Sequence, residues 1–82
     1  MAKNIKLIWD FRGPAALPTA IHHEKHLQDY IAIEEISLNI TGHQQLNDMH
    51  SIAYMVVEEK NMATVRDMLK PHRGELYNAK ID

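Results

Sequence analysis

Three of the six histidines, His22, His23 and His26, fall within two turns of one predicted helix. At 100° per residue, His23 shares a stripe with apolar Leu27, while His22 and His26 flank that stripe. Spacings of three and four residues allow two imidazoles to bind one metal ion. At a helix start the macrodipole also favours neutral rings, which can accept a proton or a metal. The alternative is a set of polar residues on the exposed flank of a helix.

Further candidates lie at a strand end and in a late turn. Asp10 could act as a base or orient a histidine, or it could simply form an ion pair with Arg73. Arg73 follows His72 and could hold a carboxylate or phosphate with two hydrogen bonds, the alternative being a solvated turn charge. The candidate catalytic residues are Asp10, His23 and His72; the candidate ligand-binding residues are Arg12 and Arg73; the candidate metal ligands are His22, His23, His26 and His72.

Composition limits the chemistry that these residues can perform. The 82 residues include no cysteine, so a metal would be held by imidazole or oxygen ligands, which suits zinc or nickel. A formal charge of −2, with the basic residues scattered, argues against a nucleic-acid partner. The sequence contains no apolar run that would suit a signal peptide or a membrane span, and we therefore expect a cytoplasmic protein.

Hydrophobic periodicity predicts alternating strands and helices in one domain over residues 1–82. Thr19 is the expected N-cap of the first helix, and Asn61 that of the second, which Pro71 ends. The expected elements are a strand over 5–12, a helix over 19–35, a strand over 36–41, a polar loop over 42–48, a strand over 50–57, a helix over 61–70 and a strand over 75–81.

This βαββαβ order predicts an α+β, ferredoxin-like fold: a four-stranded antiparallel sheet of order 4-1-3-2 with both helices on one face. The topology brings all six histidines, with Asp10, Arg12 and Arg73, to one end of the domain. Ile8 and the doubly apolar second half of the 50–57 strand are expected to leave an apolar patch on the helix-free face. A patch of this kind predicts a homodimer through that face.

The segments Asp10-Phe11-Arg12-Gly13, His22-His23-Glu24-Lys25-His26-Leu27 and Pro71-His72-Arg73-Gly74-Glu75-Leu76 resemble parts of small bacterial ferredoxin-like dimeric α+β barrel proteins. That group includes antibiotic-biosynthesis-type monooxygenases, muconolactone isomerases and uncharacterised domains, some of which bind a transition metal. The resemblance covers nearly the whole chain in element order. It implies the fold and a dimer, and it carries no complete catalytic signature.

Two function classes follow from these observations. The first is a dimeric barrel that binds a small ligand or a transition metal at its histidine-rich end, either as a binding protein or as an enzyme on a small organic acid or aromatic substrate. The second is a non-catalytic interaction or regulatory dimer without a small-molecule site. Neither class names the reaction, the substrate or the metal.

Overall fold

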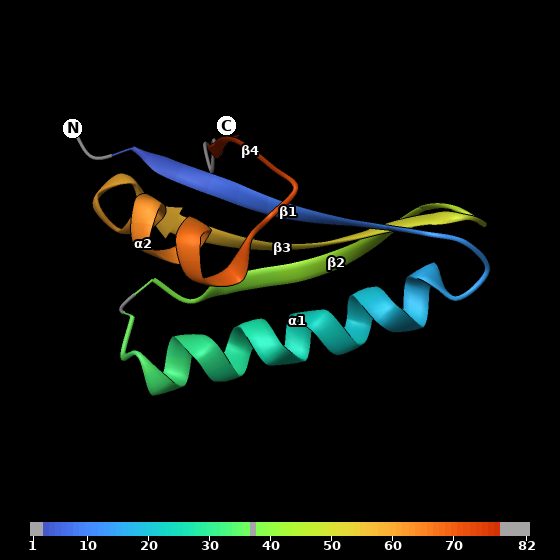
Figure 1. Cartoon of the computed structure of the whole chain (residues 1–82), viewed down its shortest axis with the longest axis horizontal. Helices are drawn as coiled ribbons and strands as arrows, with labels where there is room; N and C mark the ends of the chain where they lie inside the picture. Colours follow the sequence, from blue (N-terminus) through green and yellow to red (C-terminus); the bar gives the residue numbers. More distant parts are fainter. Residues whose placement is uncertain (1–2, 37, 78–82) are drawn as a thin grey trace, which may run out of the picture.

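A computed structural model describes residues 3–36 and 38–77 of the chain. The element order is β1 (Asn4–Arg12), α1 (Ala16–Ile33), β2 (Ile40–Asn47), β3 (His50–Glu58), α2 (Glu59–Leu69) and β4 (Arg73–Tyr77). The strands form one antiparallel sheet of order β2-β3-β1-β4, as the sequence predicted. Figure 1 shows α1 running along one side of this sheet. Among the described residues, no helix is both long and apolar enough to cross a membrane.

The main core lies between the sheet and the two helices. Alternation along β1 turns Leu7 and Trp9 toward this layer, where they join Leu27 of α1 and Val65 of α2 in one buried cluster. The Trp9 indole also donates a hydrogen bond of 3.0 Å to the carbonyl of Leu69, the last residue of α2. Both helices therefore pack against the same face, as predicted.

The helix boundaries differ from those predicted. The helix α1 begins at Ala16, and Thr19 lies inside it, donating its hydroxyl to the carbonyl of Ala15 at 2.8 Å rather than capping the N-terminus. Pro18 fits because the first-turn N–H groups of a helix need no partner within it. The helix α2 begins at Glu59, two residues before Asn61.

The largest correction concerns β2. Residues 42–47, predicted as part of a polar loop, belong to this strand, and a tight turn at Asp48 and Met49 leads into β3. Local propensity disfavours Gly42 in a strand, but the Tyr54 ring of β3 lies against the space where a Gly42 side chain would stand. Packing across the strands therefore outweighs propensity at this position. The predicted strand began at Ile36, four residues too early, and Ser37 lies outside the described residues.

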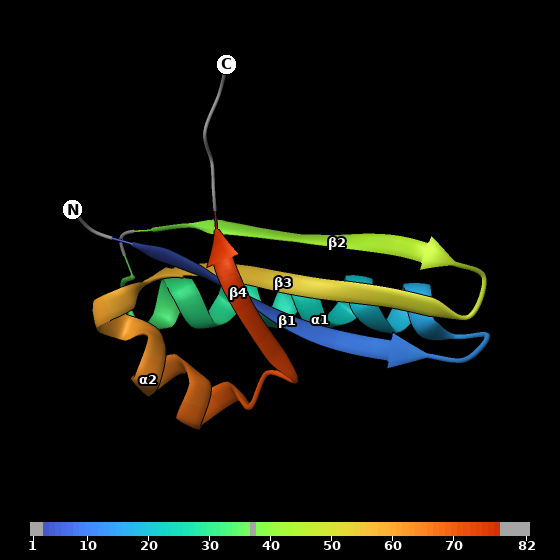
Figure 2. The ribbon, with the colours of Figure 1, turned by 90° about the horizontal axis from the view of Figure 1, so that it is seen from above.

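The strand β4 is short and strongly inclined. It covers 73–77, and Figure 2 shows it crossing at a steep angle to β1 and β3. The predicted strand began at Glu75, whereas Arg73 and Gly74 already pair with Ile8 and Leu7. The remainder of the predicted strand, 78–81, lies outside the described residues.

The helix-free face differs from the exposed apolar patch that the sequence predicted. Ile8 is only 2 % exposed and Val56 is fully buried within a single chain. The Lys6 ammonium lies 4.3 Å from the centre of the Tyr54 ring on this face. Long side chains with polar ends can cover apolar residues in this way. This face is therefore largely covered without a second copy.

Candidate functional site

Asp10 is the centre of a polar cluster formed by β1, β3 and β4. Its carboxylate accepts two hydrogen bonds from the Arg73 guanidinium, at 2.9 and 3.1 Å. The carboxylate also lies 2.8 Å from Nε2 of His50. We call Asp10, His50, His72 and Arg73 the Asp10 cluster. It realises two of the roles considered for Asp10, an ion pair with Arg73 and the orientation of a histidine, although the histidine was not among the candidates.

The charge on Asp10 is strongly stabilised. Hydrogen bonding from Arg73 lowers the pKa of Asp10 to about 2, against an opposing effect of partial burial and with further help from His50. The same contact raises the pKa of Arg73 above its usual range. A carboxylate with so low a proton affinity is a poor base near neutral pH, so this geometry favours Asp10 as an orienting residue.

His72 joins the cluster through the backbone. Its N–H donates to the Ile8 carbonyl at 2.9 Å, and its ring Nδ1 accepts a hydrogen bond from the Asp10 N–H at 2.7 Å. The imidazole thus extends the β1–β4 pairing by one contact before the start of β4. Because Nδ1 acts as acceptor, the neutral ring carries its proton on Nε2, which can donate to another group.

His23 lies on the other face of the sheet from the Asp10 carboxylate. Its ring packs at centroid distances of 4.9 Å from Trp9 and 5.4 Å from Phe11, which alternation places opposite Asp10. Its Nε2 is buried and has no hydrogen-bond partner among residues 3–36 and 38–77. Burial lowers the pKa of His23, and the nearby His26, His72 and His22 lower it further. His23 is therefore held neutral at physiological pH.

His22 and His26 form a pair on the exposed side of α1. Their Nε2 atoms are 2.9 Å apart, with the ring planes nearly perpendicular. In the described part of the chain, no three His, Cys, Asp or Glu side chains gather so as to hold a metal ion. Of the four candidate metal ligands, the structure brings two nitrogens together, while His23 faces the core and His72 binds the backbone.

A cavity of about 390 Å³ opens between β1, α2 and β4. Its apolar lining comes from Ile5, Leu7, Met62, Pro71 and Leu76. Its polar lining comes from Arg66, His72, Arg73 and Glu75, so two candidate residues, His72 and Arg73, border it. Arg12 does not line it; it is an exposed residue at the end of β1, opposite His50.

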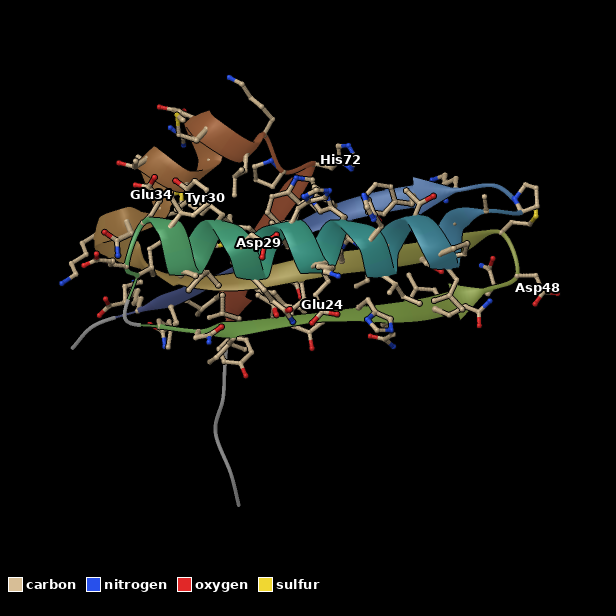
Figure 3. All side chains as sticks on the ribbon, turned by 90° about the horizontal axis from the view of Figure 1, so that it is seen from below. Glu24, Asp29, Tyr30, Glu34, Asp48 and His72 are labelled. Carbon is tan, nitrogen blue, oxygen red and sulfur yellow. The ribbon has the colours of Figure 1, made fainter. Side chains whose placement is uncertain are left out.

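A second polar cluster joins α1 to β2. Glu24 lies 2.7 Å from Nδ1 of His43 and accepts hydrogen bonds from the Thr41 hydroxyl and the Gln28 amide. Figure 3 shows Glu24 and His72 on opposite flanks of α1. The six histidines are thus distributed over two faces and two edges of the sheet.

Sequence reasoning missed His50 and His43 as partners of carboxylates. The signal for His50 was available, because antiparallel pairing of the first and third strands with Asp10 and His50 on the same side brings these residues together. The same reasoning does not identify His43 as a partner of Glu24, because the sequence predicts a loop at this position. Comparison with known proteins adds no further guide: no protein-family model, curated protein or solved structure matches this chain.

Proposed function

We propose that this protein binds a small organic acid with an apolar body in the cavity between β1, α2 and β4. The observation that carries the proposal is the composition of the cavity: apolar walls on β1 and α2, and a polar side formed by Arg66, His72, Arg73 and Glu75, where two guanidinium groups outnumber the one carboxylate. A volume of about 390 Å³ falls within the range of small-molecule sites.

The polar groups of the cavity suit a carboxylate. With Nδ1 accepting from the Asp10 N–H, the His72 Nε2–H can donate a hydrogen bond to a ligand. The Arg66 guanidinium is half-exposed and lies 3.4 Å from the adjacent Asp67, a weak surface pair that a ligand can replace. Arg73 is already committed to Asp10, so in this proposal it holds β4 in place and adds positive potential.

The proposal is tested by calorimetric titration with benzoate and with benzamide, which has the same shape and no charge. Benzoate should bind more tightly, and Arg66→Gln should weaken it by roughly tenfold, since a charge-assisted hydrogen bond is lost. Arg12→Gln is the matched control and should leave the affinity unchanged, because Arg12 does not line the cavity. Equal binding of benzoate and benzamide, or an unaffected Arg66→Gln protein, would reject the proposal.

A second candidate function, binding of a transition metal, is favoured by His22 and His26. Two nitrogens 2.9 Å apart, each about 2.0–2.1 Å from one ion, subtend an angle of roughly 90°. That angle suits octahedral or square-planar nickel better than tetrahedral zinc. Nickel affinity should fall in His22→Ala and His26→Ala but not in His43→Ala, and it should decrease as the rings become protonated at low pH. Equal nickel affinity in all three variants would exclude this pair as ligands.

A further inference from the structure

The strand β2 lies at the edge of the sheet, is long, and lacks the charged residues and proline that commonly protect an edge. It runs over eight residues, Ile40–Asn47, and lies at one side of the sheet (Figure 2). It contains no Lys, Arg, Asp, Glu or Pro, and its second half, from Gln44 to Asn47, is exposed. Natural proteins commonly block such edges with charge, proline or very short strands. The one irregularity is a bulge between Gln45 and Asn47 near the end of the strand.

The neighbouring flank of α1 carries an exposed apolar side chain among its polar residues. Glu24 and Gln28 bond to β2 residues and so mark the side of the helix that faces this edge. Ile21, three residues before Glu24, shares that side and is 46 % exposed. Leu46, on β2 itself, is 44 % exposed. The edge is therefore accompanied by exposed apolar groups on both the helix and the strand.

We infer that β2 pairs with β2 of a second copy of this chain, forming an antiparallel, eight-stranded sheet across a two-fold axis. A two-fold axis perpendicular to the sheet makes the two edge strands antiparallel and places both α1 helices on one face, with their Ile21 flanks toward each other. Because β2 contains no Lys, Arg, Asp or Glu, pairing of two β2 strands brings no like formal charges opposite each other in any register.

This surface differs from the helix-free face that the sequence predicted as the dimer contact. On that face Ile8 and Val56 are already buried within one chain, so a second copy would remove little further apolar area from water. At β2 both the backbone groups of the outer edge and the side chains of Ile21 and Leu46 gain partners. The inference does not depend on the proposed ligand.

Sedimentation equilibrium tests the inference directly. The wild-type protein should be dimeric at about 100 µM, and the double variant Gln45→Lys/Leu46→Lys should raise the dimer dissociation constant by at least about tenfold. Ile33→Lys is the matched control, because Ile33 is exposed on α1 and lies away from the Glu24 side. Lys6→Glu reports on the helix-free face and should leave the dimer unchanged.

A monomeric wild-type protein at that concentration would overturn the inference, as would a dimer that resists the β2 variant and is lost with Lys6→Glu. Hydrogen exchange on the unmodified protein gives a second measurement that does not depend on folding of a variant. In the dimer, alternate backbone amides within 40–47 should exchange more slowly at high than at low protein concentration. Exchange rates independent of concentration in this strand would contradict the pairing.

Discussion

At the scale of single residues, Asp10 links three strands through one carboxylate. Because hydrogen bonding from Arg73 holds the pKa of Asp10 at about 2, below the ordinary value of 3.8, the folded state binds its proton less readily than the unfolded chain. The stabilisation is complete above pH of about 4 and is lost as the pH falls toward about 2. It amounts to at most about 2.5 kcal/mol, and to less after allowance for solvent around the half-exposed Arg73.

Asp10→Asn should therefore lower the free energy of unfolding at pH 7 by about 1 kcal/mol and flatten its decline between pH 4 and pH 2. Urea unfolding at a series of pH values measures both effects. Asp29→Asn is the control, because Asp29 is an exposed residue of α1. If the acid limb of Asp10→Asn matched that of the wild type, Asp10 would not be the group responsible.

His23 makes the free energy of unfolding depend on pH in a higher pH range than Asp10 does. Burial lowers its pKa below the usual 6.5, so the unfolded chain takes up a proton first and stability decreases as the pH falls below about 6.5. His23→Leu removes both the titrating ring and the unpartnered Nε2, and it should reduce the difference in unfolding free energy between pH 7 and pH 5. The exposed His22→Gln should retain most of that difference. Identical pH dependence in His23→Leu and wild type would show that another group titrates.

At the scale of elements, α2 ends in a conformation that favours glycine. Lys70 follows the helix with φ 53 and ψ 58, the left-handed region, and Pro71 then prevents the helix from continuing. Lys70→Gly should raise the free energy of unfolding by about 0.5–1 kcal/mol, because glycine adopts this conformation without a steric cost. Ala63→Gly, at an exposed position in the interior of the same helix, should instead lower it by about 1 kcal/mol. Thermal unfolding of both variants measures the contrast, and a loss of stability in Lys70→Gly would contradict it.

Most of the helices and strands, but not the full extent of β2, can be predicted from the sequence. Alternation in β1, the continuous apolar run in β3 and the periodic pattern of α1 and α2 predict the element order, and the rules for connecting such elements then predict the strand order and the placement of both helices. The extent of β2 could not be predicted in this way, because residues distant in sequence hold this strand in the sheet. The Tyr54 ring lies against Gly42, and Glu24 contacts Thr41 and His43. These are contacts between distant segments, which override local propensity.

The candidate site was predictable only in part, for a related reason. Topology correctly brings Asp10, His72 and Arg73 together, since they lie where β1 meets the start of β4. Topology predicts which end of the sheet a residue lies at, but it does not by itself predict on which face or edge of the sheet the side chain lies. His23 therefore fell into the same predicted site as Asp10, although the sheet lies between them.

At the scale of the whole molecule, β4 is a short strand at the edge of the sheet. It has five residues, is paired on one side with β1, and is mostly exposed. The contacts of Arg73 and His72 with Asp10 and Ile8 fix its first end. Short, exposed elements of this kind open locally at a lower free energy than central strands such as β3. Because β4 also forms one wall of the cavity, the proposed ligand would bind only while β4 is closed and would therefore oppose its opening.

Hydrogen exchange should detect this coupling. Amides within 73–77 should exchange faster than those of β1 and β3 that pair with each other, and Asp10→Asn should accelerate them further while leaving β2 unchanged, since it removes the anchor of Arg73. Saturating benzoate should slow exchange in β4 by a factor that rises with its concentration above the dissociation constant, because only the closed state binds it. Protection by benzoate that was equal in β2 and β4 would instead indicate global stabilisation, and β4 would then not be a separately opening wall of the site.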